Sequence, residues 1–241
     1  INDFVIKFAN VNGTGSASAN GMFAKAIFRM GIPVSPRNIF PSNIQGLPTW
    51  YEVRVSQDGY LGRRGGVDMM ISVNPQSFAK DVSEVEPGGY MVYDTTKPLD
   101  LRHVRRDVNY LGIPLTEMCL REYTDSRQRQ LFKNVIYVGA LAALLNIDFA
   151  ILKDLVREQF KGKEKLITPN IHALEMGHQY ASTHFTCPLG IHLKAGEQTP
   201  KHIEEFDQIL MDGNTATALG AVYAGATVAA WYPTTPPTSV L

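Results

Sequence analysis

Cysteine is scarce in this sequence, and its scarcity excludes several kinds of metal protein. Only two cysteines, Cys119 and Cys187, occur in 241 residues. Two thiols are too few for a four-cysteine zinc site or an iron–sulfur cluster held by this chain alone. Few cysteines without a pairing pattern are typical of a protein whose thiols stay reduced, so we expect a cytoplasmic protein.

Net charge and long apolar runs are lacking as well. Lys and Arg together number 23, which equals the number of Asp and Glu. Without a basic surplus, we predict no nucleic acid and no anionic membrane surface as a partner. The most apolar helical run, residues 135–145, is shorter than the roughly 20 residues that a membrane-spanning helix needs. The start, "INDFVIKF", lacks the features of a signal peptide.

Apolar residues are plentiful, at 44% of the chain. Short, strand-like runs of them alternate with helix-like runs. The expected strands are residues 4–9, 50–55, 69–73, 90–93 and 110–113. The expected helices between them are residues 17–30, 76–82 and 115–121. This alternation predicts an α/β fold with a Rossmann-like, mostly parallel sheet.

The pattern becomes helical after Asp125, and then changes again. Further helices are expected at residues 126–145, 149–160 and 170–182, the last directly after Pro169. Residues 186–208 are interpreted as a linker, since "TCPLGIHLKAGEQTP" has no clear period. A helix at residues 213–225 and a strand at residues 227–231 would then open a second domain that stops soon after it begins. We therefore expect a first domain over residues 1–185 and a truncated one over residues 209–241.

The segment "NVNGTGSASANG", residues 10–21, joins the first expected strand to the first expected helix. Its glycines permit turns that a Cβ would hinder, and the N–H groups at a helix start attract anions. Candidate phosphate-binding residues are Gly13, Thr14, Gly15, Ser16 and Asn20. A tight turn that binds nothing explains the pattern about equally well.

The loop fits a NAD site poorly. Its spacing is G-x-G-x-x-S, with Ser18 where the dinucleotide-binding motif has a third glycine. Residues 32–38, where an acidic residue would bind the ribose hydroxyls, contain Arg37 and no carboxylate. A phosphorylated ribose, as in NADP or coenzyme A, remains compatible with this composition.

Two other groups of residues are candidates for a metal site and for a ligand cleft. His184 and Cys187 have usable ligand spacing, but two further ligands are not evident nearby, so no metal site is predicted. Arg54 alternates with apolar residues in "WYEVRV", which indicates a side chain that points toward a cleft. An ordinary solvated cation is the alternative for Arg54.

The last residues, "YPTTPPTS", combine prolines with hydroxyl side chains. Thr234, Thr235, Thr238 and Ser239 would lie at a strand-to-helix junction, where hydroxyls and helix N–H groups can hold a carboxylate or a phosphate. A proline-stiffened helix cap accounts for the same residues equally well.

Taken together, these segments resemble the alpha subunit of 2-oxoacid:ferredoxin oxidoreductases, especially the 2-oxoglutarate type. The similar stretches are "IKFANVNGTGSASANG", "PSNIQGLPTWYEVRVS", "KNVIYVGALAALLNID" and "MDGNTATALGAVYAGATVAAWYPTTPPTSVL". The last is the most specific, because it joins a Gly-Asn helix to a Tyr-Pro-x-Thr-Pro turn. The sequence departs from the family pattern at Ser18, at Thr215 in place of glutamate and at Thr234 in place of isoleucine.

The resemblance implies a Rossmann-like gamma domain followed by the start of a thiamine-diphosphate-binding pyrimidine domain. It implies oxidative decarboxylation of a 2-oxoacid with coenzyme A, with electrons passed to ferredoxin. Thr235 would contact the substrate carboxylate, and the loop of residues 13–20, with Arg54, would associate with coenzyme A. Thiamine diphosphate, magnesium and an iron–sulfur cluster would come mostly from a partner beta subunit.

Two other functions stay open at this point. One is an NADP-dependent reductase that uses the same loop. The other is a non-catalytic assembly subunit in which the loop is a bare turn. The sequence does not determine which 2-oxoacid is used or which carrier accepts the electrons.

Overall fold

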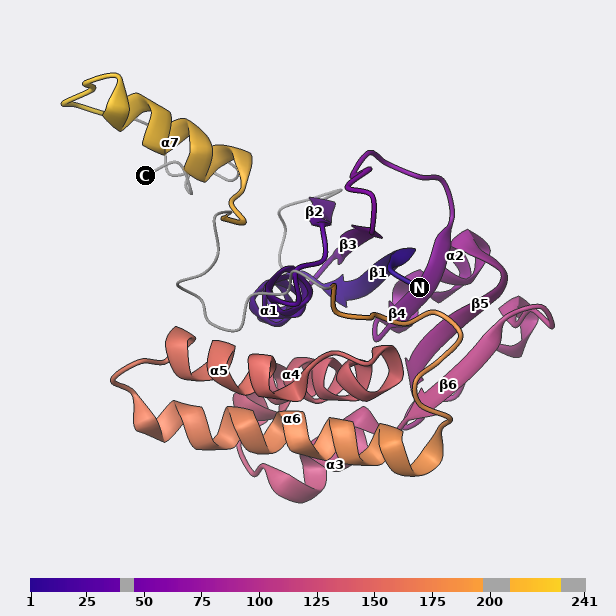
Figure 1. The fold of residues 1–241 in the computed structure, drawn as a ribbon. Helices are drawn as coiled ribbons and strands as arrows, with labels where there is room; N and C mark the ends of the chain where they lie inside the picture. The colour runs from indigo at the N-terminus through magenta and orange to yellow at the C-terminus, as the bar shows by residue number, and fades with distance from the viewer. Residues whose placement is uncertain (40–45, 197–208, 231–241) are drawn as a thin grey trace. The chain divides into compact units, whose positions relative to one another are not determined.

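The computed structural model describes residues 1–39, 46–196 and 209–230, and the chain divides into two units (Figure 1). The first unit is Ile1–Pro200 and the second is Lys201–Leu241. Each unit is a separate body, so each is described by itself.

The first unit is built on a six-stranded sheet with the order β2-β3-β1-β4-β5-β6. The strands are β1 (Asp3–Val11), β2 (Val34–Ile39), β3 (Pro48–Ser56), β4 (Val67–Ser72), β5 (Val85–Asp94) and β6 (Asn109–Ile113). Strands β1, β4, β5 and β6 are parallel, whereas β3 runs antiparallel to both of its neighbours. The prediction of a mostly parallel α/β sheet is confirmed.

Strand β2 is the one strand of this sheet that the sequence pattern did not predict. Its segment "VSPRNI" lacks apolar alternation, and between Val34 and Ile39 it has no β-branched or aromatic residue. It forms at the edge of the sheet, where Pro36 costs no ladder hydrogen bond on the open side. Neighbouring β3 therefore determines this strand more than its own residues do.

The helices of the first unit are α1 (Ser16–Arg29), α2 (Phe78–Glu84), α3 (Leu115–Glu122), α4 (Ser126–Leu145), α5 (Phe149–Gln159) and α6 (Glu164–His184). All six were predicted, but α6 begins earlier than its predicted start at residue 170. Pro169 lies inside this helix, where it removes one backbone donor. The packing of α6 along α4 outweighs this local cost.

Alternate residues of β1 point to opposite faces of the sheet, and each face has its own helices. Phe8 packs edge-on against Phe23 of α1 and contacts Tyr137 of α4. Ala9 belongs to a separate buried cluster on the other face, together with Phe78 and other residues of and near α2. Helix α1 and helix α2 therefore cover opposite faces of the sheet.

Helices α4 and α6 approach each other so closely that two glycines are required. A Cβ at Gly139 would overlap the carbonyl of Leu174, and a Cβ at Gly177 would overlap the carbonyl of Ile136. Both obstacles are backbone atoms of the opposite helix, so a rotamer change cannot relieve the overlap. Figure 1 shows the two helices lying along each other on one side of the sheet.

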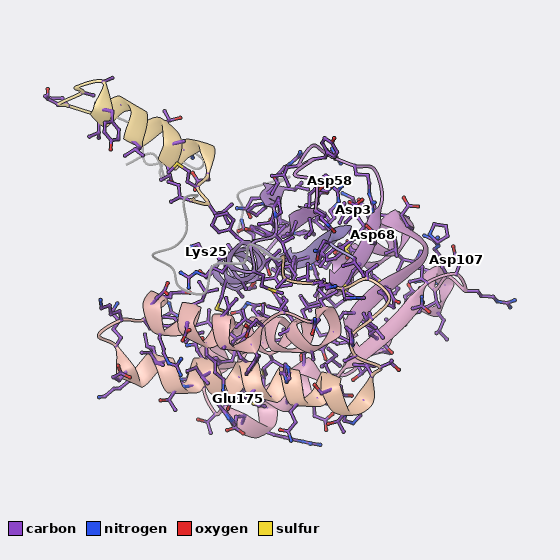
Figure 2. All side chains as sticks on the ribbon, viewed as in Figure 1. Asp3, Lys25, Asp58, Asp68, Asp107 and Glu175 are labelled. Carbon is purple, nitrogen blue, oxygen red and sulfur yellow. The ribbon has the colours of Figure 1, made fainter. Side chains whose placement is uncertain are left out.

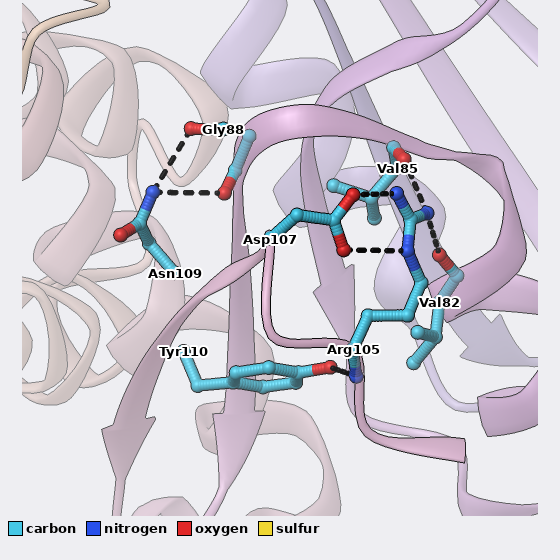
Figure 3. A network of polar contacts seen from close by, with 8 residues as sticks. Val82, Val85, Gly88, Arg105, Asp107, Asn109 and Tyr110 are labelled. Atoms are coloured by element: carbon cyan, nitrogen blue, oxygen red, sulfur yellow. Dashed lines mark hydrogen bonds and ion pairs between the residues drawn. The ribbon is translucent and has the colours of Figure 1, made fainter.

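The connection between β5 and β6 is fastened by Arg105 (Figure 3). Its guanidinium donates to the carbonyls of Val82 and Val85, at 3.0 and 2.6 Å, and to both carboxylate oxygens of Asp107. Tyr110 accepts the Arg105 backbone N–H at 2.9 Å. These bonds attach the connection to the carboxyl end of α2 and to the start of β5.

The start of the predicted linker packs on the first unit instead. Leu193 is fully buried, and the N–H groups of Leu189 and Leu193 donate to the carbonyls of Leu144 and Leu145 at 2.8 Å. The predicted domain boundary at residue 185 is therefore too early, because irregular sequence can still be held by backbone hydrogen bonds. The rest of the predicted linker, residues 197–208, lies outside the described residues.

The described part of the second unit contains one helix, α7 (Gly213–Tyr223). Asp212 caps it by accepting the Thr215 N–H at 2.8 Å. The strand predicted at residues 227–231 is wrong for residues 227–230, which adopt no regular secondary structure. The prediction of a thiamine-fold domain starting at residue 209 is not tested by this single helix.

Candidate functional site

The loop between β1 and α1 has the backbone that the sequence predicted. Gly13 and Gly15 have φ angles of 84° and 76°, which lie in the left-handed region that favours glycine. Gly15 is the N-cap of α1 and supplies no side-chain cap, so the first N–H groups of this helix are not satisfied by a capping side chain. Such a helix start attracts anions.

Helix α4 supports this loop from below. Asn134 donates to the carbonyl of Thr14 at 3.0 Å, and the Thr14 hydroxyl donates to the carbonyl of Val11 at 2.8 Å. A Cβ at Gly15 would overlap the Leu131 side chain. The loop is therefore held in one conformation by two residues of α4, Leu131 and Asn134.

Asn20 and Ser16, two of the predicted loop contacts, are buried. Asn20 is 1% exposed; its amide donates to Asn10 at 3.1 Å and its oxygen accepts the Tyr137 hydroxyl at 2.7 Å. This network joins β1, α1 and α4 beneath the loop. Asn20 therefore faces the interior and positions the helix, whereas the sequence placed it among the ligand contacts.

Arg54 lies far from the loop. It pairs with Val5 across the β1–β3 ladder, near the start of β1, whereas the loop follows the end of β1. Its guanidinium forms an ion pair with Asp3, labelled in Figure 2, and donates to the carbonyls of Phe4 and Val55. The antiparallel register thus places Arg54 at the amino end of β1, away from the loop, and its predicted contact with coenzyme A stays a prediction.

The carboxyl ends of β1 and β4 meet beside the loop. Asn74, just after β4, donates to the carbonyl of Asn10 at 3.3 Å and accepts the Gln76 N–H at 3.1 Å. From here α1 crosses one face of the sheet and α2 crosses the other. In open α/β sheets, a reversal of this kind creates the crevice in which ligands bind.

A small cavity of about 80 Å³ continues this edge between β4 and β5. Its walls include Ser72, Pro75, Tyr93, Asp94 and Lys97. Behind it, buried Asp81 accepts hydrogen bonds from Trp50, Ser72 and Ser77. Burial raises the pKa of Asp81, and these three donors oppose that shift.

Three further observations bear on the sequence predictions. Among the described residues, no group of three or more His, Cys, Asp or Glu side chains is arranged to hold a metal ion. No helix in the described ranges is long and apolar enough to cross a membrane. Thr235 and its neighbours in "YPTTPPTS" lie outside the described residues, so their role stays a prediction.

The supporting role of α4 was missed by the sequence analysis. Asn134 and Tyr137 are polar residues three apart in the apolar run "KNVIYVGALAALL", and both point toward β1 and the loop. Buried polar residues at this spacing on one helix face are a readable signal, since each must find a partner.

The model of the family described as pyruvate ferredoxin/flavodoxin oxidoreductase matches residues 5–180. The alpha subunit of 2-oxoacid:ferredoxin oxidoreductase 2 from Aeropyrum pernix is 25% identical over 97% of this chain and 41% of its own length. The chain therefore spans about two fifths of the length of that curated relative.

Solved structures agree with this match. A 2-oxoglutarate:ferredoxin oxidoreductase from Magnetococcus marinus, solved with 2-oxoglutarate, coenzyme A and succinyl-CoA bound, has a TM-score of 0.82 and 25% identity. The alignment covers 100% of this chain and 40% of that one. The pyruvate oxidoreductase subunit PORC from Thermotoga maritima has a TM-score of 0.60 and 20% identity, over 74% of this chain and 97% of its own, which shows a shared fold.

Proposed function

Because the chain belongs to the pyruvate ferredoxin/flavodoxin oxidoreductase family, we propose that it is part of the alpha subunit of a 2-oxoacid:ferredoxin oxidoreductase. The oxoacid we propose is 2-oxoglutarate. The observation that supports both statements is the likeness to the Magnetococcus marinus enzyme, which extends over the whole of this chain.

The proposed reaction converts a 2-oxoacid and coenzyme A into acyl-CoA, carbon dioxide and a proton. The bond between the carboxylate and the oxo carbon breaks, a carbon–sulfur bond forms, and two electrons pass to ferredoxin. Thiamine diphosphate supplies the electron sink for the carbanion in chemistry of this kind. We propose that the diphosphate, its magnesium and an iron–sulfur cluster are held mostly by a beta subunit.

In this proposal the β1–α1 loop binds an anionic part of coenzyme A. The support is local: two glycines with positive φ, a first turn of α1 without a side-chain cap, and a position at the carboxyl edge of the sheet. Gly13, Thr14, Gly15 and Ser16 contribute backbone groups here. Asn20 contributes by holding α1 in place.

The first test is the activity of the complete enzyme, purified with its partner subunit. We expect reduction of a low-potential acceptor with 2-oxoglutarate only when coenzyme A is present, and a smaller rate with pyruvate. Turnover without coenzyme A that releases the free acid would contradict the mechanism. Calorimetry on the full chain should detect coenzyme A, whereas binding of NADPH would favour a reductase instead.

The second test places a negative charge at the loop without disturbing the fold. Ser18 is exposed in the first turn of α1, so Ser18→Asp suits the helix dipole while it repels an anion. We expect KM for coenzyme A to rise about tenfold, which corresponds to about 1.4 kcal/mol of binding energy, with little change in kcat. Ala150→Asp, an exposed first-turn position of α5, is the matched control. Equal effects of the two variants would overturn the assignment of the loop.

Thr235 can be tested in the same assay. If its hydroxyl contacts the substrate carboxylate, Thr235→Val removes one hydrogen bond to a charged group, so kcat/KM for the oxoacid falls by roughly 1.5–3 kcal/mol, or about 10- to 100-fold. Thr235→Ser keeps the hydroxyl and should retain most of the activity. The KM for coenzyme A should not change in either variant. A Thr235→Val enzyme with unchanged kcat/KM for the oxoacid would remove Thr235 from the site.

A further inference from the structure

A second cavity, of about 220 Å³, lies between helices α3 and α4. It is lined by residues from one stripe of each helix. Helix α3 contributes Thr116, Cys119 and Leu120, and α4 contributes Ser126, Arg129, Gln130 and Lys133. Positions three or four apart share a helix face, so the lining follows from the docking of two helix faces.

This stripe of α4 is not the one that supports the β1–α1 loop. The loop contacts Leu131 and Asn134, whereas the cavity is lined by residues at positions 126, 129, 130 and 133. Asn134 follows Lys133 directly, and successive residues point about 100° apart around a helix. The two sites are therefore neighbours on adjacent parts of the α4 surface, with Gln130 and Asn134 at the border between them.

Two cationic groups that line the cavity lack part of their hydrogen-bond or ion-pair partners. The Nε atom of Arg129 is buried and has no hydrogen-bond partner in the structure. Lys133 is half-buried, and no hydrogen bond or ion pair of its ammonium is found among the described residues. A buried donor that lacks an acceptor costs free energy, and buried charges are normally paired.

The surrounding charges offset these two groups only in part. Asp94 is the carboxylate that attracts Lys133, but its oxygens already accept hydrogen bonds from the Thr116 hydroxyl and from the N–H groups of Thr96 and Thr116. Lys97 adds a further positive charge near Lys133. The Arg129 Nη2 atom donates to the carbonyl of Thr124 at 2.8 Å, which fixes the guanidinium while leaving Nε unused.

A third polar atom without a partner lies in the same part of the molecule. The buried hydroxyl of Tyr123, at the end of α3, has no hydrogen bond, and its ring stacks on Phe132 of α4 at 4.4 Å. Thus two of the three unpartnered buried side-chain atoms in the described part of the chain, Tyr123 Oη and Arg129 Nε, belong to this pair of helices. The Cys119 thiol faces the cavity but is buried, and burial raises its pKa to about 11, so it is unsuited to act as a nucleophile.

We propose that the α3–α4 cavity binds a small oxyanion of the phosphate or carboxylate class, held by the Arg129 guanidinium and the Lys133 ammonium. An oxyanion would accept from Nε and neutralise the ammonium, and the hydroxyl of Ser126 and the amide of Gln130 could complete its hydrogen bonds. The cavity is well above the volume that a single water needs, so an anion fits together with waters.

The test is calorimetric titration of the full chain with inorganic phosphate and, separately, with acetate, at low chloride concentration. We expect saturable binding of at least one of the two anions, and the tighter one identifies the class. Lys133→Met and Arg129→Gln should each weaken that binding at least tenfold. Arg127→Gln, an exposed residue of the same helix, is the matched control and should bind as the wild type does.

A thermal melt shows whether each variant is folded, so that loss of binding is not confused with misfolding. The anion that binds should raise the Tm of the wild type and of Arg127→Gln, but not that of Lys133→Met, because only a ligand that binds the folded state stabilises it. Ser18→Asp separates this site from the coenzyme A proposal, since it should leave the anion affinity unchanged. No saturable binding, equal binding by Lys133→Met, or loss of binding only in Ser18→Asp would each overturn the proposal.

Discussion

Helix α4 contacts both α6 and α3, and the two contacts are built in different ways. Toward α6, Gly139 and Gly177 bring the two backbones together until no Cβ fits between them. Toward α3, the same helix presents Arg129 and Lys133 to an open cavity, and the hydrogen-bonding capacity of these cations is only partly used. The contact with α6 is close-packed, whereas the contact with α3 retains polar groups that a packed contact would exclude.

This difference separates residues that stabilise the fold from residues that are available to a ligand. Close packing stabilises through many small contacts that all disappear when the helices separate. An unpaired buried cation does the opposite, because it costs stability until something pairs with it. Substitutions at these two contacts of α4 should therefore change the free energy of unfolding in opposite directions.

The largest effect is expected from Gly177→Ala. The added methyl group overlaps the Ile136 carbonyl, so α4 and α6 must move apart along a long contact. We expect the free energy of unfolding, measured by urea denaturation, to fall by about 3 kcal/mol, the upper part of the usual range for overpacking. The control is Gly21→Ala in α1, where no atom lies within 4 Å of the new methyl group and a gain of about 0.5–1 kcal/mol is expected. Similar stabilities of the two variants would show that the α4–α6 contact is looser than described.

A smaller effect is expected from Tyr137→Phe, which tests a buried polar group of α4 that does have a partner. The change leaves the Asn20 oxygen without the hydroxyl that donates to it at 2.7 Å. A buried acceptor without a partner costs about 1–3 kcal/mol, so the free energy of unfolding should fall by that amount. Tyr60→Phe, at a residue that is 76% exposed, should have no measurable effect. A neutral result for Tyr137→Phe would indicate that the Asn10–Asn20–Tyr137 network adds nothing to stability.

The smallest effect, with the opposite sign, is expected from Lys133→Met. Burial is the main cause that lowers the pKa of Lys133 below its usual 10.5; Asp94 and Cys119 oppose this shift and Lys97 adds to it. A lowered lysine pKa means that the folded state binds this proton more weakly than the unfolded state does. The charged ammonium therefore destabilises the folded protein at neutral pH, and Lys133→Met should be slightly more stable there.

The pH dependence follows with a definite sign. The cost of Lys133 is complete below its folded pKa and disappears as the pH rises through the unfolded value of 10.5, above which both states have lost the proton. The stability advantage of Lys133→Met should thus shrink between neutral pH and pH 10.5, measured as the difference from the wild type at each pH. An advantage that grows with pH, or a variant less stable than the wild type at neutral pH, would contradict the unpaired state of this lysine.

The parts of the fold that the sequence predicted are those determined by neighbouring residues. The β1–loop–α1 unit was predicted because strand, glycines and helix follow one another along the chain. Strand β2 was missed because its edge position, and not its composition, makes it a strand. The antiparallel direction of β3 was also not predicted, and with it the position of Arg54 at the amino end of β1, away from the loop.

For the candidate site too, the sequence predicted the local features and missed those that depend on distant residues. The glycine positions with positive φ follow from local chemistry, but the burial of Asn20 depends on Tyr137, which is 117 residues away. The α3–α4 cavity depends on how two helices dock, so no single sequence motif predicts it. A polar stripe at positions 126, 129, 130 and 133, with two cations, is visible in the sequence, yet only the docking of α3 shows that it lines a cavity.

Asn2 and Lys194, which lie 192 positions apart in the first unit, are hydrogen-bonded to each other. The Asn2 amide donates to the Lys194 carbonyl at 2.8 Å, its oxygen accepts the Lys194 N–H at 2.9 Å, and the Asn2 N–H donates to the carbonyl of His192 at 3.1 Å. This junction lies at the start of β1, whereas the glycine loop follows the end of β1. Domains whose ends lie close together can be joined to other chains or separated from them without a change of fold. The same fold occurs as nearly an entire subunit in Thermotoga maritima and within a much longer chain in Magnetococcus marinus, as expected for a unit of this kind.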